Sequence, residues 1–213
     1  MIFSSLTFLF LFLPTTFLLY AVVRGRTARN LLLAAASLVF YAFGEPVAVV
    51  IMLISIVLNY LFGLGAAGTK WDKPAVVLAV LLNIGLLVFY KYTGFLVGVC
   101  NSATGLSIPV PQIRLPIGIS FFTFQGLSYV IDVYRDKKNV QRNLFSVLLY
   151  ISFFPQLIAG PIVRYSDIAA QLDRREFNFD RISRGICRFL FGLAKKGADR
   201  QSDGADRGQG IFL

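Results

Sequence analysis

Long apolar runs separated by short polar and basic connections dominate the chain. A membrane-spanning helix needs about 20 predominantly apolar residues, and the runs that reach this length are 2–23, 47–67, 75–99 and 115–134. Two shorter runs, 31–43 and 144–160, do not comfortably cross a bilayer. The pattern predicts an all-α polytopic membrane protein with about five to six transmembrane or re-entrant helices.

Composition and charge support this class. Hydrophobic residues make up 56% of the 213 positions, above the roughly 45 to 50% of soluble domains, and the mean hydropathy is +0.69. The formal net charge is +10, but the basic residues lie in the connections between apolar runs. Cytoplasmic loops and anionic lipid headgroups explain that distribution. The lipid bilayer is therefore the expected partner, and nucleic acid is not.

The basic residues also predict an orientation. Arg24, Arg26 and Arg29 follow the first run, which is too long for a cleavable signal and is expected to stay as an anchor with its N-terminus outside. Later connections alternate as the positive-inside rule requires. The outer ones have few basic residues (44–46 and 101–114), whereas the inner ones contain Lys70, Lys73, Arg135, Lys137, Lys138 and Arg142.

The segment 144–163 breaks this alternation if it simply crosses. A crossing would place six arginines outside, namely Arg164, Arg174, Arg175, Arg181, Arg184 and Arg188. Pro155 lacks an N–H, and Gly160-Pro161 ends a helix, so this segment has the breaks of an interrupted helix. We therefore expect it to enter from the cytoplasm, line a cavity there and return. An ordinary spanning helix with a proline kink is the alternative.

The last part of the chain has a different pattern. RISRGICRFLFGLAKK at 181–196 alternates apolar and basic groups at helical spacing, which suits a helix in the membrane interface or the start of a further spanning helix. GADRQSDGADRGQGIFL at 197–213 then has no large apolar residue before Ile211. Codons for such residues, read one base out of phase, encode an apolar continuation. We expect a domain at 1–196 and a frameshifted terminus at 197–213, or alternatively a disordered polar tail.

Polar residues inside the apolar runs are candidates for function. Gln125 and Asp132 lie on or near one face of the run 115–134, and an acid in a membrane segment suggests a functional site. Alternatively, Asp132 forms an interfacial salt bridge with Arg135. Asn59 and Asn83, each in the middle of a run, favour hydrogen bonds between helices.

No metal site is predicted. Cys100 and Cys187 are far apart and lack neighbouring His or Cys, so neither a metal nor a disulfide is indicated, and each is expected to be a small buried hydrophobe.

Two long motifs resemble a known family. LPIGISFFTFQGLSYVIDVYR at 115–135 and YISFFPQLIAGPIVRYSDI at 150–168 are similar to the membrane-bound O-acyltransferases, specifically the branch of alginate O-acetyltransferases. MIFSSLTFLFLFLP at 1–14 and LVFYAFGEP at 38–46 fit the same branch. The resemblance runs from residue 1 to about 196 and implies the N-terminal half of a larger helical membrane fold.

The resemblance implies an activity as well. Members are multi-pass proteins of the bacterial inner membrane that transfer an acyl group from a cytoplasmic thioester, acetyl-CoA or another, to a hydroxyl on the opposite side. The expected acceptor is an exported, alginate-like polysaccharide, with periplasmic acetylation proteins as further partners and no bound cofactor. Gln156, Arg164, Gln125 and Asp132 are then candidates to line the donor-side cavity, with Arg164 suited to a phosphate of the donor or of a lipid.

One absence limits this implication. The family's catalytic histidine lies in its C-terminal half, and this chain contains no histidine. No catalytic residue is assigned, and the chain alone is expected to be inactive. A non-catalytic membrane scaffold and a transporter component are the alternatives; broken helices also mark transporters, but no internal repeat is evident.

Overall fold

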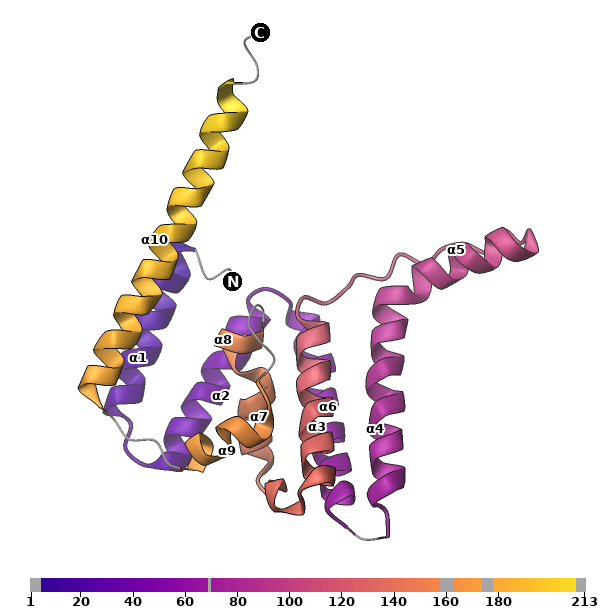
Figure 1. Ribbon diagram of the computed structural model, residues 1–213, viewed down its shortest axis with the longest axis horizontal. Coiled ribbons are helices and arrows are strands. Elements are labelled where there is room, and N and C mark those ends of the chain that lie inside the picture. Colours follow the sequence, from indigo (N-terminus) through magenta and orange to yellow (C-terminus); the bar gives the residue numbers. More distant parts are fainter. Residues whose placement is uncertain (1–4, 69, 158–162, 174–177, 210–213) are drawn as a thin grey trace.

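Most of the described chain is helical. The computed structural model describes residues 5–68, 70–157, 163–173 and 178–209, and these ranges contain no strand (Figure 1). The α-helices are α1 (Leu13–Val22), α2 (Arg26–Ala42), α3 (Pro46–Ala67), α4 (Asp72–Leu87), α5 (Thr93–Thr104), α6 (Ile119–Arg135), α7 (Leu144–Ser152), α8 (Phe154–Leu157), α9 (Tyr165–Asp173) and α10 (Phe179–Gln209). π-helical turns precede α1 (Thr7–Phe12) and join α4 to α5 (Val88–Tyr92), and a 3-10 turn follows α6 (Lys137–Asn139).

The core is a bundle in which α3 occupies the centre. α4 and α6 pack against α3 and against each other, and α2 and α7 pack together and also contact α3. Buried apolar side chains from all five helices form one cluster, which includes Ala34, Met52, Ile56, Ala79, Phe122, Val130, Val147 and Ile151. The predicted all-α architecture is confirmed over the described residues.

A pair of asparagines lies inside this core. Asn59 of α3 and Asn83 of α4 are fully buried and exchange hydrogen bonds through their side-chain amides. Gly126 of α6 faces them so closely that an added Cβ would lie 2.6 Å from Asn59 Nδ2. The predicted bond between helices is therefore confirmed, and a glycine lets the third helix approach it.

A separate aromatic cluster attaches the N-terminal helical segment. Phe8, Phe12, Phe40 and Phe154 contact one another with ring centroids 5.4 to 6.1 Å apart. The backbone N–H of Phe154 also donates to Ser37 Oγ of α2 at 3.2 Å. Such ring pairs contribute about 0.5 to 1.5 kcal/mol each beyond area burial, so the cluster holds residues 7–12 and α8 on α2.

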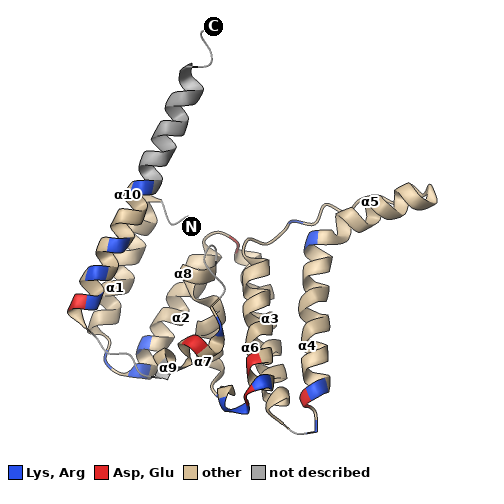
Figure 2. Cartoon of the chain, viewed as in Figure 1, with Lys and Arg blue, Asp and Glu red and all other residues tan. Residues whose placement is uncertain are grey.

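The basic residues gather at one end of the bundle. Figure 2 shows Lys and Arg at the lower ends of α2, α4 and α6, whereas few charged residues lie at the upper end. The basic residues in and beside the connections at the lower end are Arg24, Arg26, Arg29, Lys70, Lys73, Arg135, Lys137, Lys138 and Arg142. The loops expected to share a side of the membrane therefore share an end of the bundle.

Lys137 ties three helices together at the basic end. Its Nζ donates to the carbonyl of Ala66 in the last turn of α3 and lies 3.4 Å from Asp72 Oδ2 at the start of α4. It also sits 4.9 Å from the ring centroid of Tyr134 in α6. A cation at a helix C-terminus interacts favourably with the helix dipole.

The predicted spans are only partly reproduced. Pro46–Ala67 and Asp72–Thr104 are helical stretches long and apolar enough to cross a membrane. The second is not straight, because the π-helical turn at 88–92 ends α4 and α5 turns away from the bundle (Figure 1). The first run forms a shorter helical stretch, Thr7–Val22, and the run from 115 becomes helical only at Ile119. The count of five to six spans remains a prediction.

A further expectation is corrected. Cys100 and Cys187 are exposed rather than buried, because α5 and α10 lie at the periphery of the bundle (Figure 1). Residues 197–209 are helical and continue α10, and the boundary at 196 stays a prediction. The frameshift itself remains a prediction, and 210–213 lie outside the described residues.

Candidate functional site

The helix that the sequence predicts to be broken is broken at Pro155. α7 ends at Ser152, Phe153 takes a non-helical conformation, and α8 restarts with Pro155 in its first turn. In a continuous helix Pro155 would remove the bond to the Ile151 carbonyl and clash with it, whereas a first turn needs no N–H there. The predicted break at Pro155 is confirmed. Gly160 and Pro161 lie outside the described residues.

The chain comes back to the end of the bundle where α7 began. Gln141, just before α7, donates through Nε2 to Tyr165 Oη at 3.1 Å, and Tyr165 starts α9. The middle of the element lies at the opposite end of the bundle. There Leu157 of α8 packs against Gly118 at the start of α6, so closely that a Cβ on Gly118 would lie 2.9 Å from the Leu157 carbonyl oxygen. The element therefore reaches the opposite end of α6 and has both flanks at the basic end. A re-entrant path through the membrane stays a prediction.

Three tyrosines hold the returning chain. The ring of Tyr165 packs edge-on against those of Tyr129 and Tyr150, with centroids 5.0 and 5.2 Å away. Tyr150 Oη donates to the Val163 carbonyl at 2.8 Å. All three tyrosines are buried. These contacts bring together residues 36 positions apart in sequence, from 129 to 165, which is why periodicity alone did not reveal them.

Two of the predicted site residues meet beside the break. Gln125 of α6 donates from Nε2 to Gln156 Oε1 of α8 at 3.2 Å. Gln125 is 1% exposed, and its Oε1 is buried without a hydrogen-bond partner among the described residues. Leaving a buried acceptor unpaired costs about 1 to 3 kcal/mol. The carbonyl oxygen of Gln125 is therefore suited to accept a hydrogen bond from an N–H or O–H group that the described residues do not provide.

Gln156 also opens onto a cavity. A space of about 240 Å³ lies between α7, α8 and α9, and its walls are Leu149, Tyr150, Phe153, Gln156, Ile168, Gln171 and Leu172. Most of these side chains are apolar, and the two glutamines supply amide groups. Largely apolar walls with a few placed polar groups are usual for small-molecule sites.

Asp132 and Arg164 lie apart from the glutamine pair. Asp132 is seven residues after Gln125 on α6, about 10 Å along the helix axis, and its Oδ2 accepts a hydrogen bond from the Ser166 N–H at 3.4 Å. A carboxylate at the N-terminus of α9 stabilises that helix. Asp132 thus positions α9, and this backbone contact stands in place of the salt bridge to Arg135.

Arg164 precedes α9 at the basic end. It is exposed, and its carbonyl accepts from the Asp167 N–H. The four predicted residues therefore do not form one cluster. Gln125 and Gln156 pair near the break, whereas Asp132 and Arg164 flank the point where the chain returns.

An ion pair that the sequence did not predict lies at the other end of the bundle. Arg114, in the loop before α6, lies 3.0 Å from Glu45 in the turn before α3, and Glu45 is largely buried. Tyr41 Oη donates to the Ile117 carbonyl of the same loop at 2.7 Å. Two features of the sequence pointed to this pair. Glu45 lies in a turn that has no basic residue, and Arg114 is the one basic residue of the loop 101–114 expected on the same side.

The described residues do not offer a metal site. No group of three or more His, Cys, Asp or Glu side chains that could hold an ion exists among them.

The fold and the site define a helical membrane protein with a broken, returning element. Comparison with known proteins narrows this class to a family. A probable alginate O-acetylase of Pseudomonas syringae pv. tomato is 40% identical over 205 residues, which cover 92% of this chain and 39% of that protein. The corresponding protein of Pseudomonas aeruginosa is 40% identical over 204 residues, with the same coverage.

A more distant relative extends the comparison. A peptidoglycan O-acetyltransferase of Helicobacter pylori is 32% identical over 230 residues, covering 92% of this chain and 44% of that protein. No protein-family profile matches the chain, and no solved structure matches it. The resemblance to the alginate branch of the O-acyltransferases is confirmed. The chain spans about two fifths of the length of these relatives.

Proposed function

We propose that the chain forms the N-terminal part of a membrane-bound O-acetyltransferase, with several passes through a bacterial inner membrane. In the reaction, a polysaccharide hydroxyl attacks the carbonyl carbon of an acetyl thioester. The new ester C–O bond forms, the hydroxyl proton passes to a base, the C–S bond breaks, and the thiolate that leaves takes up that proton from the base. The relatives are named for alginate and for peptidoglycan, and we propose an exported, alginate-like polysaccharide as the acceptor.

The broken element between α7 and α9 carries this proposal. Interrupted helices are tolerated at membrane depth only where protein or a water-filled cavity satisfies the backbone. Here the interruption adjoins a cavity and a buried amide with a free acceptor. This arrangement suits the passage of a polar substrate group from the basic end toward the interior, with Gln125 and Gln156 as hydrogen-bonding partners.

Arg164 is proposed to serve the donor. A guanidinium binds phosphate oxygens through paired, charge-assisted hydrogen bonds, and Arg164 is exposed at the end where the cytoplasmic thioester would enter. Asp132 acts on the same region indirectly, because it holds the first turn of α9 next to Arg164.

The base is proposed to come from another segment. Histidine is the side chain whose ordinary pKa best suits removal of a hydroxyl proton near neutral pH, and this chain has none. We therefore expect no transfer by the 213-residue chain alone. Periplasmic acetylation proteins are further proposed partners of the complete enzyme.

A chimera tests the proposal. Residues 1–196 of this chain are joined to the remaining C-terminal part of the Pseudomonas aeruginosa relative and expressed in cells that lack their own alginate O-acetylase. The expected result is acetylated alginate, measured as ester content of the exported polymer. The C-terminal part alone and the 213-residue chain alone are the controls, and both should give none.

Failure has a defined meaning in this experiment. A chimera that accumulates in the membrane but leaves the polymer unacetylated contradicts the proposal and favours a non-catalytic scaffold. Solute movement by the 213-residue chain in sealed vesicles favours a transporter component instead.

A further inference from the structure

Helix α10 has two chemically distinct faces, and neither is covered by the rest of the described chain. With about 100° between successive residues, the basic residues Arg181, Arg184, Arg188 and Lys195 fall within a sector of about 60°. The residues on the opposite side are Phe179, Ile182, Ile186, Phe189, Leu190 and Leu193. The only acid between Phe179 and Lys195 is Asp180, so the polar face is strongly cationic, although Phe191, 82% exposed, borders it next to Arg184.

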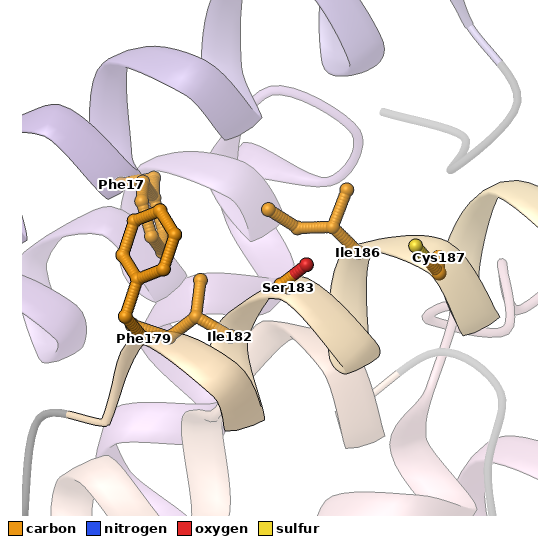
Figure 3. A pocket seen from close by; sticks show the side chains of 6 residues that line it. All are labelled: Phe17, Phe179, Ile182, Ser183, Ile186 and Cys187. Carbon is orange, nitrogen blue, oxygen red and sulfur yellow. The ribbon is translucent and has the colours of Figure 1, made fainter.

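The apolar face makes little contact with protein. Figure 3 shows Phe17 of α1 near Phe179 and Ile182, and these residues line a shallow hollow of about 220 Å³ together with Ser183, Ile186 and Cys187. Beyond this contact, Ile186 is 49% and Leu190 55% exposed. α1 contributes one residue, Phe17, to the lining of this hollow. This single contact leaves most of the apolar face of α10 exposed.

A membrane-crossing position does not suit these two faces. Figure 2 shows the basic residues spaced along α10, which runs beside α1 from the basic end of the bundle. If α10 crossed the bilayer in that direction, Arg184 and Arg188 would lie in hydrocarbon, where a cation is strongly disfavoured. Segregated apolar and basic faces are the signature of helices that lie in the interface.

The side of the membrane follows from α9. Asn30, at the start of α2 near the basic end, donates from Nδ2 to the Leu172 carbonyl at the end of α9, at 3.2 Å. α10 begins shortly afterwards at the same end (Figure 1). We propose that α10 turns away from α1 and binds the anionic lipid surface of the cytoplasmic leaflet, with its apolar face in the acyl boundary and Arg181, Arg184 and Arg188 among the lipid phosphates.

This interaction is independent of acyl transfer. Each basic residue near an anionic surface strengthens binding roughly fivefold at moderate ionic strength, and screening by salt weakens it. The basic face of α10 therefore selects lipids by their charge. Its binding would fix the depth of the basic end of the bundle relative to the headgroups, whatever reaction the complete protein performs.

Cys187 provides the probe. It is exposed and lies at the boundary between the two faces, so a spin label there reports the depth of α10. The full 213-residue chain, with Cys100→Ala, is reconstituted in nanodiscs of phosphatidylcholine with either no or about 30% phosphatidylglycerol. With the anionic lipid, the label should become less mobile and lie at headgroup depth, judged by its collisions with oxygen and with a water-soluble nickel chelate. Salt at 0.5 M should reverse the change.

A matched charge variant isolates the basic face. R181Q/R184Q/R188Q should reduce the phosphatidylglycerol response at least tenfold on the lipid-concentration scale. K70Q/K73Q/K138Q removes three charges outside α10 at the same end of the bundle and should keep the response. The salt titration of the chain with all its charges tests the proposal even if a variant fails to insert.

Other outcomes overturn the proposal. A label at the bilayer centre in both lipids means that α10 crosses the membrane. A label shielded from both collision partners means that a protein surface, from another segment or a second copy, covers α10. Equal loss of response in the two charge variants means that net charge alone, and not this helix, binds the lipid.

Discussion

Asn59 and Asn83 join α3 to α4 by a reciprocal pair of amide hydrogen bonds. Asn83 Nδ2 donates to Asn59 Oδ1 at 2.8 Å, and Asn59 Nδ2 donates back to Asn83 Oδ1 at 3.2 Å. Asn59 also donates to the Ser55 carbonyl, and Asn83 to that of Ala79. Both side chains therefore have their polar groups paired inside an apolar core.

Breaking one half of this pair should destabilise the bundle. Asn83→Leu leaves Asn59 Oδ1 without its donor, and we expect a loss of about 1 to 3 kcal/mol of unfolding free energy. The double variant N59L/N83L removes both polar groups and should cost less than the sum of the single variants. Reversible unfolding in mixed detergent micelles measures the difference. Strictly additive single and double effects would show that the bonds contribute nothing beyond packing.

A methyl group at Gly126 should be poorly tolerated. It would lie 2.6 Å from Asn59 Nδ2 and 2.8 Å from Asn59 Cγ, and the amide pair prevents Asn59 from moving away. Gly126→Ala is expected to lower stability by about 1 to 3 kcal/mol. Gly85→Ala on α4 meets no atom within 4 Å and is the matched control, expected to be neutral or mildly stabilising. A similar loss for both substitutions would contradict the close packing at Gly126.

The path of the chain around the break can be mapped by labelling. In a background without Cys100 and Cys187, the exposed positions Arg142 and Arg164 are each changed to cysteine. Both should react with an impermeant maleimide from the cytoplasmic side, because the re-entrant element has both flanks at the basic end. Arg114→Cys should react from the outside. Opposite reactivity of positions 142 and 164 would establish a single crossing.

The unpaired acceptor of Gln125 should matter for transfer more than for folding. In the chimera, Gln125→Leu removes the acceptor and the bond to Gln156, and we expect roughly tenfold less acetyl transfer with normal membrane levels, the effect of about one hydrogen bond. Thr123→Val is the control, since Thr123 Oγ1 is also buried and unpaired on α6 but is not paired with α8. Unchanged transfer by Gln125→Leu would assign the glutamines a structural role only.

Arg164 is expected to affect the affinity for the donor. In the same chimera, Arg164→Ala should raise the KM for the acyl donor about tenfold and change kcat little, since a lost charge-assisted hydrogen bond costs about 1.5 to 3 kcal/mol. Arg164→Lys should recover part of the loss because it restores the charge without the paired geometry. An unaltered KM in Arg164→Ala would leave lipid phosphate as the better partner.

The features that the sequence predicted correctly are those in which a polar residue or a proline lies in an apolar run. Two asparagines in apolar runs predicted a bond between helices, and Pro155 in a short apolar run predicted the break, because each is costly unless the structure compensates. The turn at Val88–Tyr92 was not predicted, since neither Pro nor Gly lies within it and Lys91 is the one charged residue of the run 75–99. Nor could the contact of Tyr165 with Tyr129, which depends on the return of the chain.

The errors have a physical cause too. Cys100 and Cys187 were expected to be buried because free cysteine usually is, but both lie on helices outside the central bundle. For Asp132, the sequence offered only the nearby Arg135 as a partner, whereas the Ser166 N–H arrives from a segment 34 residues later. Local sequence cannot rank such distant partners.

The contacts of Lys137 bear on how the bundle can move. This lysine joins the end of α3, the start of α4 and the end of α6, while the amide pair of Asn59 and Asn83 fixes α3 to α4 at mid-height. A slide of one helix by a single turn, about 5.4 Å, would break both attachments at once. The three helices are thus expected to act as a rigid frame, so that any motion accompanying substrate passage falls to the outer helices α1, α5 and α10.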